Sequence, residues 1–142
     1  QLNYKNWDFG FNGHGSFGYK VFNDFASNNS TAYFDVNAGN LPNFATAVKR
    51  TGFTQISGDY QFFSDFYLEN ASFFRMDDIN LGYTFKEIGN WQGNIRVAAS
   101  CQNVFVLTKY SGIDPEINST DGVDRTFWPR PRTFSVRLNV NF

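Results

Sequence analysis

Cysteine and histidine are nearly absent from this 142-residue sequence, which contains one residue of each, Cys101 and His14. A single cysteine excludes an internal disulfide framework, and the two residues are too few for a zinc site built from cysteine and histidine. We interpret Cys101 as a small apolar residue on the outer face of a strand, because it continues the alternating run of Ile95, Val97 and Ala99.

Long apolar runs and an excess of either charge are also missing. Without a run of about eighteen apolar residues the chain has no membrane-spanning helix, but strands of a membrane barrel remain possible. The 12 basic residues nearly balance the 13 acidic ones, which argues against a nucleic-acid partner. The first ten residues lack a basic head and an apolar core, so we expect that a signal peptide was removed or that the chain begins partway through a larger protein.

Motifs that carry catalysis or bind nucleotides are missing as well. The sequence has no G-x-S-x-G and no H-E-x-x-H. Asp77 and Asp78 are neighbours in a predicted strand and should point to opposite faces, which argues against an acid–base pair. Residues 13–18 match G-x-G-x-x-G, but no buried strand leads into a helix there, as a dinucleotide site requires. We therefore expect neither an enzyme nor a cofactor.

What the sequence does contain is alternation with a period of two. In residues 6–21 the odd positions are aromatic, glycine or valine, and the even positions are mostly polar. Such alternation puts one set of side chains on each face of a strand. A strand of about sixteen residues is long enough to cross a membrane when tilted, whereas strands of soluble sheets usually have about five or six.

Three further strands follow the same pattern. We predict strands over residues 6–21, 68–85, 93–105 and 132–142, with a bulge near Met76, Asp77 and Asp78 where the alternation changes phase. A short turn at residues 86–92 joins the second and third strands. Residues 22–66 and 108–130 are long polar connections, and residues 45–50 are a candidate helical turn within the first of them.

The order of a long connection, a short turn and a long connection is typical of an outer-membrane barrel, whose external loops are long and whose periplasmic turns are short. Four strands cannot close a barrel, and an open sheet would leave unpaired edges in lipid. We therefore predict an all-β fold, four antiparallel strands of a larger membrane β-barrel, with residues 22–66 and 108–130 outside the cell. The alternative is a soluble all-β glycan-binding module, whose strands should be shorter.

Four ordered segments carry a family resemblance: YKNWDFGFNGHGSFGYKVFN (4–23), YLENASFFRMDDINLGYTF (67–85), QNVFVLTKYSGIDPEIN (102–118) and GVDRTFWPRPRTFSVRLNVNF (122–142). Together they resemble the C-terminal part of the SusC/RagA-like, TonB-dependent outer-membrane transporters of Bacteroidetes. The resemblance implies a barrel of 22 strands around an N-terminal plug. This chain would supply the last four strands, and the plug and the TonB box would lie outside it.

The resemblance also implies a function and a set of partners. Such a protein would actively import oligosaccharides or peptides, with energy supplied through TonB. Its partners would be the remainder of the barrel and its plug, a SusD-like surface lipoprotein, the TonB complex acting through the missing N-terminal part, the barrel assembly machinery and outer-membrane lipid.

The second long connection holds the candidate contacts with a substrate or with the lipoprotein, because exposed aromatic residues are common anchors at interfaces. Its aromatic residues could equally form a girdle at the level of the lipid headgroups. The acidic run in residues 114–124 lacks the glycine and glutamate of an EF-hand loop, so a turn-rich surface loop is favoured over a metal site. The candidate contacts are Tyr110, Asp114, Glu116, Phe127 and Trp128.

The last predicted strand ends in a row of alternating apolar residues whose final member is the C-terminal Phe142. Such a row resembles the signal by which the bacterial assembly machinery recognises an outer-membrane barrel, plausibly through pairing of strand edges. The alternative is that Phe142 only completes the lipid-facing row. The residues of the candidate signal are Phe134, Val136, Leu138, Val140 and Phe142.

Overall fold

The computed structural model describes residues 1–33, 48–55, 64–88, 91–117, 119–125 and 128–142. Its contacts divide the chain into two compact units. Unit 1 comprises Gln1–Ser16, Phe73–Thr108 and Arg130–Phe142, and unit 2 comprises Phe17–Ser72 and Lys109–Pro129. No helix in the described ranges is long and apolar enough to cross a membrane.

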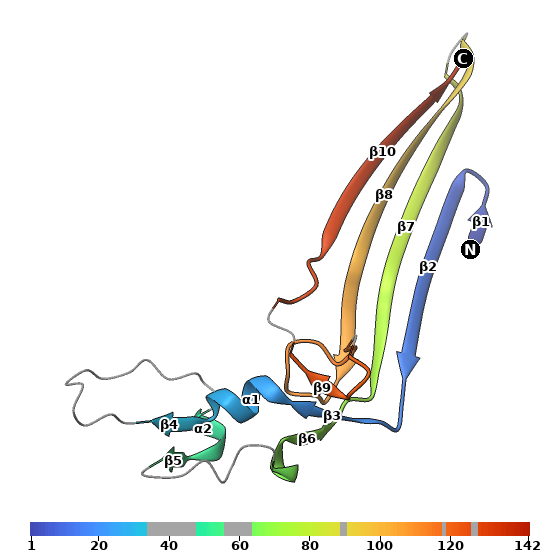
Figure 1. Cartoon of the computed structure of the whole chain (residues 1–142). Coiled ribbons are helices and arrows are strands. Elements are labelled where there is room, and N and C mark those ends of the chain that lie inside the picture. The colour runs from blue at the N-terminus through green and yellow to red at the C-terminus, as the bar shows by residue number, and fades with distance from the viewer. Residues whose placement is uncertain (34–47, 56–63, 89–90, 118, 126–127) are drawn as a thin grey trace, which may run out of the picture. The chain divides into compact units, whose positions relative to one another are not determined.

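Unit 1 is one antiparallel sheet of five strands in the order β1-β2-β7-β8-β10 (Figure 1). With 16 and 18 residues, β7 and β8 are about three times as long as a typical strand. The prediction of an all-β fold built from long antiparallel strands is thus confirmed. The strands are β1 (Leu2–Tyr4), β2 (Trp7–Ser16), β7 (Phe73–Ile88), β8 (Trp91–Thr108) and β10 (Thr133–Asn141).

The strand predicted over residues 6–21 ends early, at Ser16. Gly18 has a φ of 80°, a left-handed conformation that interrupts an extended chain and that glycine adopts readily. The residues after it form β3 (Lys20–Asn23) in unit 2, where Val21 is fully buried. The prediction that Val21 continues the row of odd-numbered residues of the first strand is therefore wrong. The short β1 was not predicted, and the two-residue turn after it begins at Lys5, whose φ is 54°.

The second and third strands also differ from their predicted bounds. Residues 68–85 are divided between β6 (Leu68–Asn70) in unit 2 and β7 in unit 1. Ile88 of β7 pairs with Trp91 of β8, so the turn predicted at residues 86–92 is mostly strand. β8 continues to Thr108, which pairs with Phe73, and it is longer than the predicted 93–105 at both ends. β10 matches the predicted residues 132–142 to within one residue at each end.

The predicted bulge in the second strand is confirmed. β2 pairs Asn12 with Asp78 and Gly13 with Met76, which leaves Asp77 as the extra residue of β7. Asp77 Oδ2 lies 2.8 Å from Nδ1 of His14, and His14 is on the polar face of β2. The expectation that Asp77 and Asp78 point to opposite faces is therefore wrong, because the bulge interrupts the alternation between them.

The register of the sheet separates apolar from polar side chains. Cross-strand partners share a face, and the apolar partners form continuous rows, such as Phe11, Ile79, Cys101 and Phe134. No described residue covers this face, on which Phe134, Val136 and Leu138 are 74%, 79% and 64% exposed. The predicted place of Cys101 on the apolar face of its strand is confirmed by its pairing with Ile79 and Phe134.

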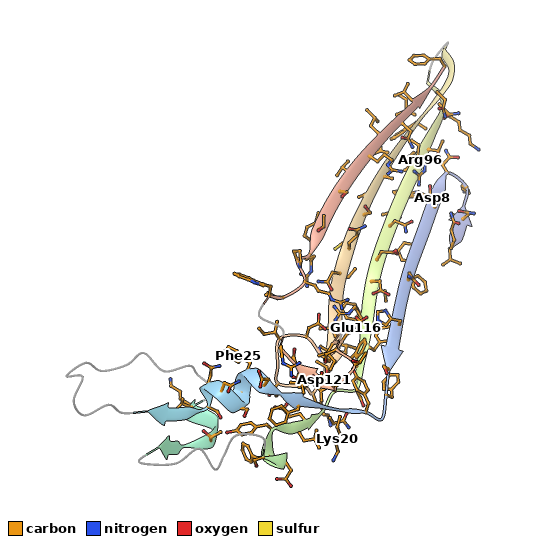
Figure 2. The ribbon with its side chains drawn as sticks, in the orientation of Figure 1. Asp8, Lys20, Phe25, Arg96, Glu116 and Asp121 are labelled. Carbon is orange, nitrogen blue, oxygen red and sulfur yellow. The ribbon has the colours of Figure 1, made fainter. Side chains whose placement is uncertain are left out.

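The polar face of unit 1 carries an ion pair that crosses three strands (Figure 2). Arg96 of β8 donates two hydrogen bonds to Asp8 of β2, from Nε to Oδ1 at 3.0 Å and from Nη2 to Oδ2 at 2.5 Å. Gly82 of β7 lies beneath the pair, since it is the register partner of Asp8. A Cβ atom at Gly82 would lie 2.6 Å from Arg96 Nη2 and would also clash with the Asp8 carboxylate. Gly82 therefore provides the space in which the ion pair forms.

Unit 2 contains segments of both long connections, which were predicted as two separate loops. β3 pairs with β6 in antiparallel and with β9 (Val123–Asp124) in parallel orientation. A second parallel pair is formed by β4 (Thr31–Tyr33) and β5 (Phe53–Gln55). The helical elements are α1 (Asp24–Asn29), α2 (Val48–Thr51) and the 3-10 helix η1 (Asp65–Tyr67). The predicted helical turn at residues 45–50 overlaps α2, and residues 45–47 lie outside the described residues.

The described residues of unit 2 include a buried apolar cluster. Val21, Ala71 and Tyr110 form this cluster, and Tyr19 and Ile117 pack against it. α1 begins directly after β3 because Asn23 caps it, its side-chain Oδ1 accepting a hydrogen bond from the Ala26 amide at 2.9 Å. Hydrogen bonds between segments also hold the described part of unit 2 together.

Replacing Gly82 with alanine in the full-length protein is expected to lower the free energy of unfolding, because the new methyl group displaces the bidentate ion pair of Asp8 and Arg96. Denaturant-induced unfolding in detergent would measure this loss. In a background that already carries Asp8→Ser and Arg96→Gln, the same Gly82→Ala change should have little effect. Equal losses in the two backgrounds would contradict the proposed role of Gly82.

Candidate functional site

A buried hydrogen bond joins the start and the end of the second long connection. The Tyr110 hydroxyl donates to Asp124 Oδ2 at 2.7 Å, and both side chains are buried. Burial, together with the neighbouring Asp124 carboxylate, raises the pKa of Tyr110 above its usual value, so the phenol stays protonated and remains a donor. The bond holds Tyr110 against the short strand β9, to which Asp124 belongs.

Glu69 joins three segments of unit 2. Its Oε2 accepts a hydrogen bond from the Ser111 amide at 2.9 Å, and its Oε1 accepts one from Ser111 Oγ at 2.5 Å. The same Oε1 accepts a third bond from Asn23 Nδ2 at 3.1 Å. One carboxylate from β6 therefore holds the second connection beside β3, and charge-assisted hydrogen bonds of this kind are stronger than neutral ones.

The turn at residues 114–116 is held from two sides. Asp114 Oδ1 accepts a hydrogen bond from the Glu116 amide at 2.9 Å, which is an Asx-turn. The Pro115 carbonyl accepts a hydrogen bond from the Tyr19 hydroxyl at 2.9 Å. Asp114 and Pro115 are both buried, so this acidic segment is directed into unit 2.

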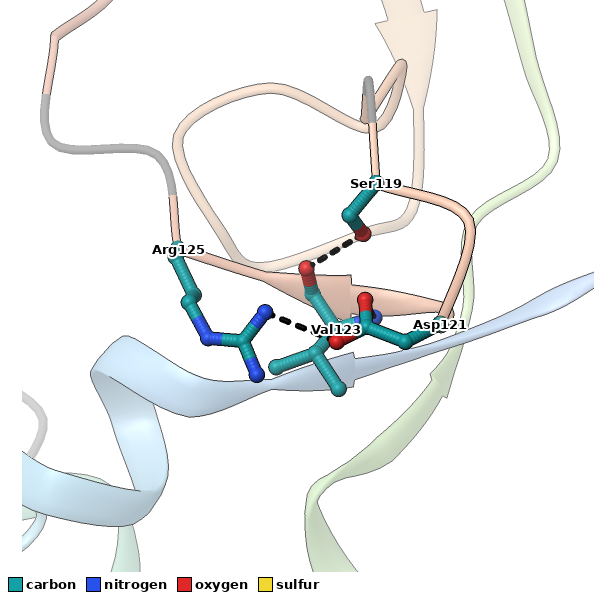
Figure 3. A network of polar contacts seen from close by, with 4 residues as sticks. All are labelled: Ser119, Asp121, Val123 and Arg125. Atoms are coloured by element: carbon teal, nitrogen blue, oxygen red, sulfur yellow. Dashed lines mark hydrogen bonds and ion pairs between the residues drawn. The ribbon is translucent and has the colours of Figure 1, made fainter.

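A second polar network lies at the surface, around the start of β9 (Figure 3). Asp121 Oδ2 accepts from Arg125 Nη1 at 2.8 Å, Asp121 Oδ1 accepts from the Val123 amide at 3.2 Å, and Ser119 Oγ donates to the Val123 carbonyl at 2.7 Å. The Arg125 guanidinium and the other donors lower the pKa of Asp121 to about 2, and the Asp121 carboxylate raises the pKa of Arg125. The network shapes the turn at Gly122, whose φ is 73°.

The five predicted contact residues of the second connection fall into three groups. Tyr110 and Asp114 are buried and form hydrogen bonds within unit 2, and their contact with a substrate or a lipoprotein stays a prediction. Glu116 is partly buried, whereas Trp128 is 83% exposed and free to meet a partner. Phe127 lies outside the described residues. The Tyr110 side chain also belongs to the buried apolar cluster of unit 2.

Three polar residues that organise the site were missed by sequence reasoning: Asn23, Glu69 and Asp124. Asn23 had a usable local signal, because an asparagine directly before an acidic residue is a preferred helix cap. Glu69 and Asp124 had none. Glu69 lies 42 residues from its partner Ser111, and no sequence pattern relates residues that far apart.

The surface of unit 2 carries exposed aromatic side chains that could bind a protein or a ligand. Among the described residues, no group of three or more His, Cys, Asp and Glu side chains is placed to hold a metal ion. Large aromatic side chains are exposed instead, and such residues commonly anchor protein or ligand interfaces. Among the described residues of the unit, the large aromatic side chains that are exposed are Phe17, Phe25, Phe66 and Trp128.

Acid should loosen the surface network in a defined range of pH. Because the folded-state pKa of Asp121 is lowered to about 2, its ion pair with Arg125 contributes fully above about pH 4 and is lost as the pH falls toward 2. Hydrogen exchange of the Val123 amide, corrected for its intrinsic pH dependence, should therefore accelerate from pH 5 to pH 2. An Asp121→Asn variant should show no such change, and protection that is equal at both pH values in the unaltered protein would contradict the assignment.

Comparisons with known proteins agree on one group. No family model matches the chain. TonB-dependent receptor SusC of Bacteroides thetaiotaomicron is 38% identical to it over 151 aligned residues, which cover 100% of this chain and 14% of the receptor. TonB-dependent receptor P3 of Formosa agariphila is 28% identical over 162 aligned residues, covering 99% of this chain and 15% of that receptor.

A solved structure shares the fold. The structure of the RagAB peptide importer in its closed-closed state matches with a TM-score of 0.64 over 95% of this chain and 15% of the matched chain, at 18% identity. The chain thus spans about a seventh of the length of the proteins that it matches. At this level of identity the structural match concerns the fold alone.

Proposed function

Because the chain is homologous over its whole length to SusC and other TonB-dependent receptors, we propose that it is part of an outer-membrane active transporter. The homologous receptors are outer-membrane β-barrels, and this chain supplies strands of such a barrel wall. On our proposal the whole protein imports oligosaccharides or peptides, works with a SusD-like surface lipoprotein and draws its energy through TonB.

The observation that carries this proposal is the two-faced sheet of unit 1. Its strands are long enough to cross a bilayer with a tilt, since about ten residues suffice for a transmembrane strand. One face is apolar and uncovered by any described residue, and the other is polar. A soluble glycan-binding module would have to bury that apolar face in a core, so the alternative function is not favoured.

Unit 2 is proposed to lie outside the cell. β7 and β8 are joined by a short connection, whereas the segments that form unit 2 are long, and outer-membrane barrels place their long connections outside. The exposed Trp128 and the partly buried Glu116 remain predicted contacts with the lipoprotein or the substrate. The hydrogen bonds of Tyr110, Asp114 and Glu69 would hold those contacts in a defined position.

The class of substrate is left as oligosaccharide or peptide. The structural neighbour is described as a peptide importer, whereas the oligosaccharide follows only from the family resemblance of the sequence. The relatives are receptors and transporters, which supports a role without catalysis. Further proposed partners are the remaining wall and plug of the barrel, TonB through the N-terminal part of the whole protein, the barrel assembly machinery and outer-membrane lipid.

Two arginine substitutions in the whole transporter test the assignment of the faces. Leu138→Arg places a charge on the apolar face and should cost about 2–4 kcal/mol near the middle of the membrane, because the guanidinium would lie in hydrocarbon. Asn139→Arg places the same charge on the polar face and should be mild. Unfolding from lipid vesicles measures stability, and TonB-dependent uptake of labelled oligosaccharides and peptides measures function. Equal losses for both variants, or uptake that continues without TonB, would refute the proposal.

A second prediction concerns Phe142, which is fully exposed at the C-terminus. If the row from Phe134 to Phe142 is an assembly signal, then removing Phe142 should sharply reduce the amount of transporter in the outer membrane, more than Phe134→Ala does. If Phe142 only ends the lipid-facing row, its loss should change thermal stability and leave the membrane level normal. Quantitative immunoblotting of outer-membrane fractions separates the two outcomes, and a normal level would disprove the signal.

A further inference from the structure

A hollow of about 690 Å³ is bordered by β7, β8 and β10, and most of its lining residues belong to the polar face of unit 1. Ala99, Val136 and Leu138, which belong to the opposite face, also border it. Ala98 contributes only a methyl group to it, and Gly82, its register partner on β7, has no side chain. Hollows of this size are typical of small-molecule sites. The polar side chains that line it are Asn80, Arg96, Ser100, Gln102, Ser135 and Arg137.

The charges around this hollow have one sign. Its only charged lining residues are Arg96 and Arg137. Arg96 is paired with Asp8 through two hydrogen bonds, and that pairing fixes the orientation of its guanidinium. Arg137, the register partner of Ala98, forms no ion pair with any described residue and is exposed. The hollow therefore presents one positive charge that is not neutralised within the described part of the chain.

The side chains that line the hollow favour the binding of an anionic group. A guanidinium presents its N–H groups as a planar fork that matches a carboxylate, and a pair of this kind is stronger than a neutral hydrogen bond. The neighbouring amides and hydroxyls can donate or accept further bonds. No aromatic side chain lines the hollow, so it offers no ring on which a neutral sugar could stack.

We propose that this hollow binds a carboxylate group of the imported solute, with Arg137 as the main anchor. The inference rests on the proposed function, because it takes the polar face as the wall along which the solute passes. It deepens that function by naming the substrate class: the solute bears a carboxylate, carried either by a peptide or by an acidic sugar. Asp8 and Gly82 act as positioning residues, since they hold Arg96 beside the hollow.

Binding to the purified full-length transporter in detergent, measured by fluorescence anisotropy, tests the proposal with two pairs of dye-labelled probes. The first pair is tetra-alanine with a free C-terminal carboxylate and its C-terminal amide. The second is a galacturonic acid tetramer and a galactose tetramer. We expect the charged member to bind about tenfold more tightly in one pair, and that pair identifies the carboxylate as peptide or sugar.

Variants show whether the preference arises in this hollow. Arg137→Gln should abolish it, and Arg137→Lys should restore part of it, because an ammonium retains the charge without the fork. Lys86→Gln is the matched control, since it removes a positive charge from the same face outside the hollow and should leave the preference intact. A preference that survives Arg137→Gln, or that is lost equally in Lys86→Gln, would overturn the proposal.

Failure of this inference can be told apart from failure of the proposed function. If both probe pairs bind without a charge preference while TonB-dependent uptake persists in cells, the hollow is not a carboxylate site and the transport proposal stands. If the transporter is absent from the outer membrane, or if uptake does not need TonB, the transport proposal fails and the inference that rests on it fails too.

Discussion

Backbone N–H and C=O groups find no water in the hydrocarbon layer of a membrane, so every strand that crosses it must be hydrogen-bonded to a neighbour along its whole length. β7 and β8 satisfy this condition for each other, with pairing that runs from Phe73 and Thr108 to Ile88 and Trp91. The outer edge of β10 has no partner among the described residues. The alternation of side chains follows from the same pairing, because a fully paired strand exposes one set to lipid and the other to water.

Hydrogen bonds also determine how the segments of unit 2 are arranged, for a different reason. Its described residues include several buried polar groups, which are costly unless they are paired. The structure pairs Tyr110 with Asp124, and Glu69 with Ser111 and Asn23. Such networks specify one arrangement because a shift of any segment would leave a buried donor or acceptor without its partner.

The period-two pattern was sufficient to predict the four longer strands of unit 1 and the bulge at Asp77, since these features depend on neighbours within one strand. The pattern did not predict features that depend on the conformation of a single residue or on a partner far away in the sequence. The left-handed Gly18 ends β2, and the fold alone brings Asp8 to Arg96 across 88 residues of sequence. In the candidate site, Trp128 was predicted to be exposed and is, whereas the burial of Tyr110 depends on Asp124 and on the strands beneath it.

The hydrogen bond from Tyr19 to Pro115 joins residues that lie 96 positions apart, and the parallel pairing of β3 with β9 is similarly distant. Contacts of such long range form late, because the chain between them has to be in place before closing the loop brings any gain. Unit 2 therefore cannot be completed until β7 and β8 have been made and the segment after them has been delivered. Its closure would be a late event in the maturation of the protein, and a closed unit 2 would be a sign that the preceding hairpin is already present.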